Sequence, residues 1–198
     1  MFTGIIEALG KIEKLVPEQD NLHIYCSCPF TNELKMDQSL AHNGVCLTVV
    51  EINNNQYKVT AIKETLNKTN LFNLKVNDVI NLERCMPANG RFDGHIVQGH
   101  VDQTAVCIER KELNGSWIFT FSYDISEGNI TVEKGSITIN GVSLTVVNSN
   151  QDSFSVCIIP YTYEHTNFKN IKINTTVNLE FDIVGKYVAK LIGKNLVG

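Results

Sequence analysis

The sequence predicts an all-β protein made of two copies of one antiparallel barrel or sandwich, followed by an amphipathic helix. Three observations support this fold class. A segment recurs almost unchanged, short strand-like runs alternate with turn-forming residues in both halves, and a helical spacing of apolar residues appears at the end of the chain. Many short, closely spaced strands are typical of antiparallel barrels and sandwiches, and a long internal repeat indicates duplicated domains.

The repeat is clearest at residues 39–50 and 136–147. Within these segments NGVCLTVV and NGVSLTVV share seven of eight residues and lie 97 positions apart. Each copy has the pattern of a hairpin, with a short strand, an Asn-Gly turn and a β-branched strand. The repeat continues to KVNDVINLE and KINTTVNLE, which share five of nine residues. We therefore predict barrels at residues 1–88 and 89–182 and a helix at residues 183–198.

In the first copy, residues 2–15 predict a strand interrupted near two glycines, and residues 22–28 alternate apolar and polar side chains as a strand does. Further strands are predicted at residues 56–62 and 78–85, with a short helix at residues 64–73 between them. Turn-forming Pro, Asn and Gly residues then mark a linker, after which the strand patterns start again.

Beyond Asp182 the apolar residues recur at the i, i+4 spacing of an amphipathic helix, with lysines on the opposite side. They are Ile183, Val184, Tyr187, Val188, Leu191 and Ile192. The first half has no such segment, so neither barrel needs the helix in order to close. Its apolar face could pack on other subunits or cap its own barrel, and the sequence leaves both interpretations open.

Composition limits the partners. The formal net charge is −4 and no basic run stands out, so nucleic acid and an anionic membrane are not expected. No stretch is long and apolar enough to span a membrane, and the first residues lack the pattern of a secretion signal, so we expect a cytoplasmic protein. The six cysteines are scattered and are expected to be reduced. Cys26 and Cys28 share a strand face, but without a second pair we favour buried thiols over a metal site.

The two copies differ at turns, where ligands usually bind on barrels. Cys46 stands where the second copy has Ser143, and Ile5 stands where it has His100. His100 is a candidate acid–base group because imidazole titrates near neutral pH, with a buried structural role equally open. His95 lies five positions earlier, on the opposite face of a straight strand, so we do not expect a chelating pair.

Cys46 could act as a nucleophile, donate a weak hydrogen bond or fill the core, and its sequence context favours the core. Polar side chains recur at matching or nearby places in both copies. These are Ser39, Thr48 and Lys63 in the first copy and Lys134, Ser143 and Thr145 in the second. Two similar polar sites suggest two similar small ligands, although the spacing of the residues names no reaction.

Four motifs together resemble the riboflavin synthase family. They are the opening MFTGIIE, AHNGVCLTV in the first half, GHIVQGHV between the halves and ITINGVSLTV in the second half. The resemblance spans both halves and the final helix. It implies two six-stranded Greek-key barrels and a C-terminal helix that holds a homotrimer together.

The resemblance also implies a transferase activity. Members of this family dismutate two molecules of 6,7-dimethyl-8-ribityllumazine by moving a four-carbon unit from one to the other, without a metal or cofactor. The products are riboflavin and 5-amino-6-(D-ribitylamino)uracil, and the reaction is the last step of riboflavin biosynthesis. The implied partners are this small-molecule substrate and the other subunits of the trimer, with lumazine synthase as a further candidate.

Matched by position to the family, one lumazine site is expected on each barrel. The first-barrel site comprises Gly4, Ile5, Ile6, Ser39, Cys46, Leu47, Thr48, Thr60, Ala61, Ile62, Lys63, Glu64 and Thr65. The second-barrel site comprises Gly99, His100, Val101, Lys134, Ser143, Leu144, Thr145, Cys157, Ile158, Ile159, Pro160, Tyr161 and Thr162. The resemblance makes His100, Ser39, Cys46 and Phe2 the catalytic candidates.

A binding protein of the same fold, which carries the chromophore without converting it, is the main alternative. Such proteins tend to lose the polar residues of the reaction centre, and this chain keeps Ser39, Cys46 and His100 as well as Phe2. A flavin reductase barrel would need a nicotinamide domain with a GxGxxG turn, which this chain lacks. An oligonucleotide-binding barrel would need a basic groove with stacking aromatic residues, which a net charge of −4 does not favour.

Overall fold

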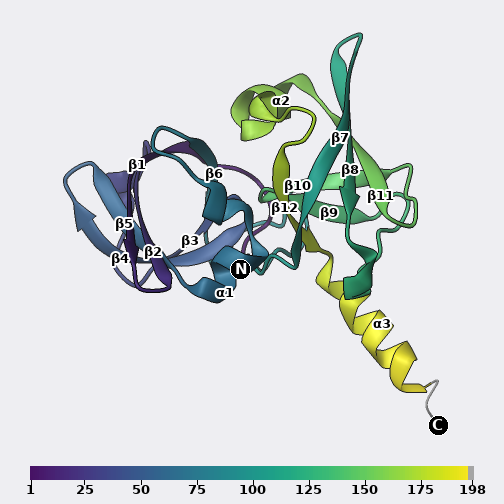
Figure 1. Cartoon of the computed structure of the whole chain (residues 1–198), viewed down its shortest axis with the longest axis horizontal. Coiled ribbons are helices and arrows are strands. Elements are labelled where there is room, and N and C mark those ends of the chain that lie inside the picture. Colours follow the sequence, from purple (N-terminus) through teal and green to yellow (C-terminus); the bar gives the residue numbers. More distant parts are fainter. Residues whose placement is uncertain (196–198) are drawn as a thin grey trace.

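The computed structural model describes residues 1–195 and contains two closed antiparallel barrels of six strands, followed by a C-terminal helix (Figure 1). In the N-barrel the neighbouring strands follow the order β1-β2-β5-β4-β3-β6, and the C-barrel repeats it as β7-β8-β11-β10-β9-β12. The non-consecutive neighbours, such as β2 with β5, give a Greek-key connection. The predicted fold class is therefore confirmed.

The N-barrel comprises β1 (Ala8–Glu18), β2 (Asn21–Ser27), η1 (Thr31–Glu33), β3 (Ser39–His42), β4 (Val45–Asn53), β5 (Gln56–Ala61), α1 (Lys63–Lys68), η2 (Asn70–Asn73) and β6 (Val79–Arg84). The C-barrel comprises β7 (Gln103–Leu113), β8 (Ser116–Tyr123), η3 (Ile125–Glu127), β9 (Ser136–Ile139), β10 (Val142–Val147), β11 (Ser153–Ile158), α2 (Pro160–His165), η4 (Asn167–Asn170) and β12 (Thr176–Phe181), and α3 spans Ile183–Asn195. The strand predicted from residue 2 begins only at Ala8, because Gly4 has a φ of 80°, outside the range of a strand.

Each barrel closes over its own core because alternate residues of every strand point inward. The N-barrel core is mainly aliphatic, with Ile12 and Leu82 fully buried, whereas the C-barrel core is rich in aromatic rings, including Phe119, Phe121 and Phe154. Burying one such side chain contributes about 1.5–3 kcal/mol. The two cores are separate clusters, so the duplicated halves are two domains.

Three pairs of asparagines join the barrels at the pseudo-twofold axis that relates the two copies. The members of each pair stand 97 positions apart, and they are Asn43 with Asn140, Asn70 with Asn167, and Asn81 with Asn178. Asn43 Oδ1 accepts hydrogen bonds from Asn81 N at 2.9 Å and from Asn167 Nδ2 at 3.0 Å. Asn140 Oδ1 accepts the equivalent bonds from Asn178 N at 2.9 Å and from Asn70 Nδ2 at 3.1 Å. Each of these two side-chain oxygens therefore accepts one hydrogen bond from its own barrel and one from the opposite barrel.

The two Asn-Gly turns meet at the same axis. Asn43 and Gly44 have φ values of 47° and 81°, which fit the left-handed turn predicted from the hairpin pattern. A Cβ atom on Gly44 would lie 2.8 Å from Gly141 N, and one on Gly141 would lie 2.8 Å from Gly44 N. The close contact therefore requires glycine in both copies.

Two segments outside the strands cross between the barrels. We call residues 2–6 the first strap and residues 95–101 the second strap. They pair at Phe2 and Val97, where each N–H donates to the other residue's carbonyl oxygen, at 2.8 and 3.1 Å. Ile6 of the first strap packs on the C-barrel core, and Val101 of the second strap packs on the N-barrel core. Each strap thus precedes one barrel in the sequence and contacts the other barrel in space.

Helix α3 projects away from both barrels (Figure 1). Its apolar side chains stay exposed, with Tyr187 at 65% and Leu191 at 61%, so the helix does not cap its own barrel. Residues 196–198, the end of the predicted helix, lie outside the described part of the chain. Within residues 1–195, no helix is long and apolar enough to span a membrane.

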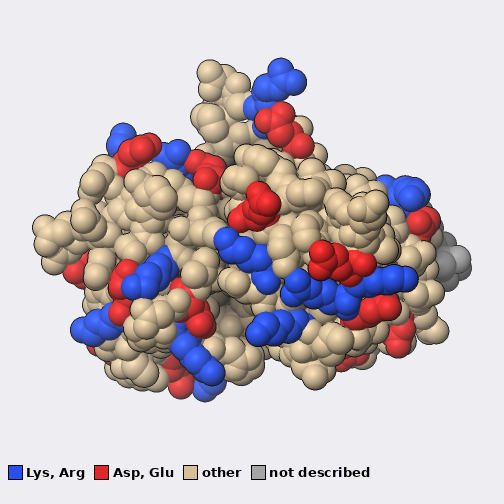
Figure 2. Space-filling view, turned by 90° about the horizontal axis from the view of Figure 1, so that it is seen from above, with Lys and Arg blue, Asp and Glu red and all other residues tan. Residues whose placement is uncertain are grey.

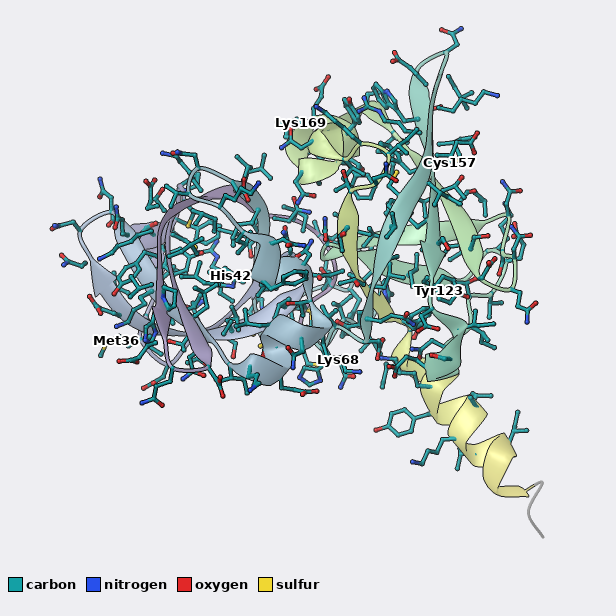
Figure 3. All side chains as sticks on the ribbon, viewed as in Figure 1. Met36, His42, Lys68, Tyr123, Cys157 and Lys169 are labelled. Atoms are coloured by element: carbon teal, nitrogen blue, oxygen red, sulfur yellow. The ribbon has the colours of Figure 1, made fainter. Side chains whose placement is uncertain are left out.

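One polar pair is buried inside the N-barrel (Figure 3). His42 is 1% exposed, with Nδ1 3.0 Å from Leu40 O and Nε2 2.9 Å from the Tyr57 hydroxyl. Because a carbonyl oxygen can only accept, Nδ1 carries the proton and Nε2 accepts the hydrogen bond that Tyr57 donates. Burial lowers the pKa of His42 to about 4, so the ring is neutral. The C-barrel has Ile139 and Phe154 at these two positions.

We expect His42 to make the fold less stable in acid. Its pKa is about 4 in the folded protein and about 6.5 in an unfolded chain, so in this range of pH only the unfolded chain binds the proton. Between about pH 7.5 and about pH 5 the free energy of unfolding should fall by about 2 kcal/mol from this group. The double variant His42→Ile/Tyr57→Phe, which copies the C-barrel pair, should lack this contribution in urea titrations, whereas Tyr57→Phe alone should keep it. Identical pH dependence in the wild type and the double variant would contradict this role of His42.

Candidate active site

Three strands of the N-barrel bring its polar candidates onto one face. Ser39 on β3 lies opposite Thr48 on β4, and Ala41 on β3 lies opposite both Cys46 on β4 and Glu83 on β6. The residues between them point into the barrel core, as the alternation of a strand requires. A hydroxyl pair and a thiol predicted from the first repeat therefore do share one surface.

The second strap lies over Cys46. The Cys46 N–H donates to Gly99 O at 2.9 Å, and a Cβ atom on Gly99 would come within 2.6 Å of Cys46 Cβ. Gly99 also has a φ of 79°, so glycine is required for this approach. Burial raises the pKa of the Cys46 thiol, and a hydrogen bond with Ser39 acts in the opposite direction. At neutral pH the group is therefore a thiol rather than a thiolate.

His100 follows Gly99 and is exposed. The backbone N–H groups of Gln98, Gly99 and His100 donate to the carboxylate of Glu180 at 2.6, 2.9 and 3.0 Å. Glu180 is only 3% exposed, and burial raises its pKa while the strap N–H groups and Lys186 act against that rise. The buried Glu180 side chain thus fixes the backbone of His100 and of Gly99, the residue that covers the Cys46 thiol.

Phe2 of the first strap is fully buried against the second strap and the N-barrel. It forms a small cluster with Ala41 and Val97, against which Cys46 and Cys85 pack. With 0% exposure, its ring does not face solvent on the candidate surface. In the structure the Phe2 ring packs beneath Cys46, another of the predicted catalytic residues.

The first strap repeats this arrangement on the C-barrel. The Ser143 N–H donates to Gly4 O at 2.8 Å, and Glu83, which is buried, accepts a hydrogen bond from Gly4 N at 3.0 Å. Ile5, 46% exposed, occupies the position that the exposed histidine has in the other strap. The two surfaces are therefore built alike and differ at two matching positions, with Cys46 and the exposed His100 on the N-barrel surface and Ser143 and Ile5 on the C-barrel surface.

Near the candidate residues, each strap contacts the barrel other than the one to whose site we assigned it. The positional match to the family assigns residues 4–6 to the N-barrel site and residues 99–101 to the C-barrel site. The contacts are reversed, since Gly4 binds Ser143 and Gly99 binds Cys46. The crossing follows from the pairing of the two straps with each other near the axis. Both straps stay beside the candidate residues, with the barrels exchanged.

The other predicted residues lie mostly where β5 and β11 lead into helices α1 and α2, and Cys157 is labelled on the C-barrel in Figure 3. Exposed or half-buried members are Thr60, Ile62, Lys63, Glu64, Thr65, Lys134, Leu144, Thr145, Cys157, Ile159, Pro160, Tyr161 and Thr162. In contrast, Leu47, Ala61 and Ile158 have buried side chains. These three can offer a ligand only their backbone groups.

His95 was not among the predicted site residues. Its Nδ1 lies 2.7 Å from Ser143 Oγ, and its Nε2 lies 3.1 Å from Thr138 Oγ1. The spacing of His95 and His100 bears only on a shared metal ion, and it says nothing of partners on other strands. The available signal was the serine that replaces a cysteine in the second repeat, because a hydroxyl at that place can bind an imidazole.

Comparison with known proteins places this geometry in a family. The family model described as the lumazine binding domain matches residues 3–85 and again residues 98–182. The riboflavin synthase of Actinobacillus pleuropneumoniae is 43% identical over 98% of this chain and 91% of its own length. Those of Bacillus subtilis (strain 168) and Mycobacterium tuberculosis (strain ATCC 25618 / H37Rv) are 38% and 39% identical, over 98% and 97% of this chain and 91% and 98% of their own lengths.

Solved structures of LumP have the same fold. LumP complexed with 6,7-dimethyl-8-(1'-D-ribityl) lumazine has a TM-score of 0.84 and 21% identity, over 91% of this chain and 99% of that one. LumP complexed with riboflavin has a TM-score of 0.83 and 24% identity, over 91% of this chain and 98% of that one. At such low identity these two structures show the fold alone. The family is shown by the match of the domain model to both halves and by the 38–43% identity to the synthases over nearly the whole chain. The chain belongs to the riboflavin synthase family of enzymes.

Proposed function

We propose that the protein catalyses the dismutation of two 6,7-dimethyl-8-ribityllumazine molecules into riboflavin and 5-amino-6-(D-ribitylamino)uracil, the last step of riboflavin biosynthesis. The observation that carries this proposal is that the two barrels present surfaces of the same construction that differ at two chemically important positions. Two identical substrates need two similar surfaces, and a transfer between them needs a donor and an acceptor that are treated differently. The exchange of Cys46 for Ser143 and of His100 for Ile5 supplies that difference.

The N-barrel surface is the more reactive one in this proposal. His100 is exposed and held by its backbone, so its imidazole can assist proton transfer at the acidic C7 methyl group of one lumazine. Ser39 and Cys46 lie on this same surface, and they stabilise the nucleophile that adds at C7 of the second lumazine, which the C-barrel of a neighbouring subunit holds face to face with the first. Since burial raises the pKa of Cys46, we favour hydrogen-bond donation from its thiol over attack by a thiolate.

Holding the two substrates in register accounts for most of the acceleration in this proposal. Well-oriented intramolecular reactions reach effective molarities of about 10⁵ M or more. The rigid supports of the straps favour such precision, because Glu83 and Glu180 each fix consecutive backbone N–H groups. No metal or cofactor enters the proposed reaction.

We further propose a cytoplasmic homotrimer in which α3 supplies the contact between subunits. The support is the exposed apolar stripe of this helix, with Val184 at 56%, Tyr187 at 65% and Leu191 at 61% exposure. Each N-barrel site would then face the C-barrel site of a neighbouring subunit. Figure 2 shows basic and acidic side chains beside one another on the face of the molecule seen from above. Lumazine synthase remains a further candidate partner.

A binding protein that carries lumazine without converting it is the second candidate function. The structural likeness to LumP bound to lumazine and to riboflavin favours it. The sequence identity to the synthases is higher, and the polar residues of the reaction centre are present. We therefore expect purified protein to convert the lumazine to riboflavin, with one riboflavin formed for every two lumazines consumed, as followed by absorbance. Saturable binding without any riboflavin would leave only the carrier function.

Replacing His100 with Gln should lower kcat by about 100-fold, because general acid–base catalysis contributes that much or more. Lumazine binding, measured by fluorescence titration, should stay largely intact, because the side chain assists proton transfer rather than affinity. Met36→Gln, at a position that is 64% exposed, is the control for a surface substitution to the same residue. Lost binding together with an unchanged single-turnover rate for bound substrate would reject this role.

Replacing Tyr187 and Leu191 together with Asp should convert the trimer into monomers, because each charge would lie on the apolar stripe that the helices share. Sedimentation velocity measures the change, and circular dichroism checks that the barrels remain folded. The matched control is Ile130→Asp/Val132→Asp, which charges two apolar residues with 70% and 62% exposure away from the helix. A wild-type protein that sediments as an active monomer would rule out the proposed assembly.

A further inference from the structure

The C-barrel site contains a histidine that the proposed reaction does not yet use. His95, in the second strap, is half-buried and contacts two strands through its ring, with Nδ1 2.7 Å from Ser143 Oγ on β10 and Nε2 3.1 Å from Thr138 Oγ1 on β9. Thr138 lies opposite Ser143 in the pairing of these strands. The imidazole therefore bridges the hydroxyls of one cross-strand pair.

The backbone holds this ring in place. The His95 N–H donates to Thr3 O at 3.1 Å, so the two straps bind each other at this point. A Cβ atom on Gly94 would collide with Thr3 O and would lie 3.0 Å from Ser143 Oγ. The close approach of the chain to Ser143 thus depends on a glycine directly before the histidine.

The N-barrel has no equivalent of this bridge. Ala41 stands where the C-barrel has Thr138, and Cys46 stands where it has Ser143. An imidazole at that place would find no pair of hydroxyls. The bridge is therefore a further difference between two surfaces that otherwise share the same strands and strap contacts.

The charge of the ring determines what the bridge does. Burial lowers the pKa of His95, and the negative charge of Asp182 acts in the opposite direction. A neutral imidazole has one nitrogen that donates and one that accepts, so one of the two hydroxyls accepts a hydrogen bond from the ring and the other donates one to it. Ser143 then presents a defined donor or acceptor to its surroundings, which a freely rotating hydroxyl would not.

We propose that His95 is a positioning residue, which orients the Ser143 hydroxyl as the hydrogen-bonding group that binds lumazine at the C-barrel site. The inference rests on the proposed function and adds to it the residue that sets the polarity of the second site. His95 acts through Ser143 and need not touch the ligand. The half-buried Ser143 side chain, next to the exposed Thr145 two residues along the same strand face, is the group that meets the substrate.

Two substitutions of His95 separate positioning from packing. Asn carries its polar atoms where imidazole has Nδ1, whereas Gln carries them where imidazole has Nε2. His95→Asn should therefore keep the bond to Ser143 and retain most of the affinity. His95→Gln should lose that bond and weaken one of the two ligand sites by about tenfold, the usual effect of one hydrogen bond. Fluorescence titration with riboflavin measures both affinities.

Ser143→Ala should weaken the same site to the same degree, and the double variant His95→Gln/Ser143→Ala should be no weaker than Ser143→Ala alone. This non-additivity is expected because both changes remove one interaction. Equal losses for Asn and Gln, or fully additive losses in the double variant, would overturn the positioning role. Binding is measured at equilibrium without turnover, so a wild type that binds riboflavin but fails to produce it would refute the proposed reaction and leave this test intact.

Discussion

The contact between the two Asn-Gly turns is the constraint on which the rest of the molecule depends. Gly44 and Gly141 approach so closely that a methyl group on either would meet the backbone of the other. Around them three pairs of asparagine amides bind across the axis. This junction sets the relative position of the barrels, and the position of the barrels decides where the straps can cross. The chemistry of both surfaces follows from that crossing.

Each candidate site is consequently composite. The thiol of Cys46 belongs to the N-barrel, while the strap that covers it and carries His100 leads into the C-barrel and is held there by Glu180. Close to this point Asp102 accepts a hydrogen bond from Phe181 N at 2.9 Å and pairs with Lys186 of α3 at 2.6 Å. The base of the helix is therefore linked through a few polar contacts to the strap that carries the imidazole.

Much of the architecture could be predicted from the sequence, because a duplicated hairpin with an Asn-Gly turn has a local pattern. The amphipathic spacing after Asp182 likewise predicted α3. The exchange of the straps could not be predicted, since Gly4 and Gly99 differ in no local pattern from turn glycines that stay within one barrel. His95 was missed for a related reason, because its partner Ser143 lies 48 positions away on another strand. Tertiary pairing of this kind leaves no periodicity to detect.

The crossed straps have a consequence for how such a molecule could be divided. A half-length chain with a single barrel would carry a strap shaped for a barrel that it lacks, and its own reactive face would stay uncovered. Two such half-length chains could each find a barrel for the strap and a cover for the reactive face only by exchanging straps across the twofold axis, as in a domain-swapped dimer. When the two halves are joined in one chain, the exchange of straps takes place within one molecule. Each barrel can then diverge in sequence, but neither can be lost because each supplies the strap that covers the other.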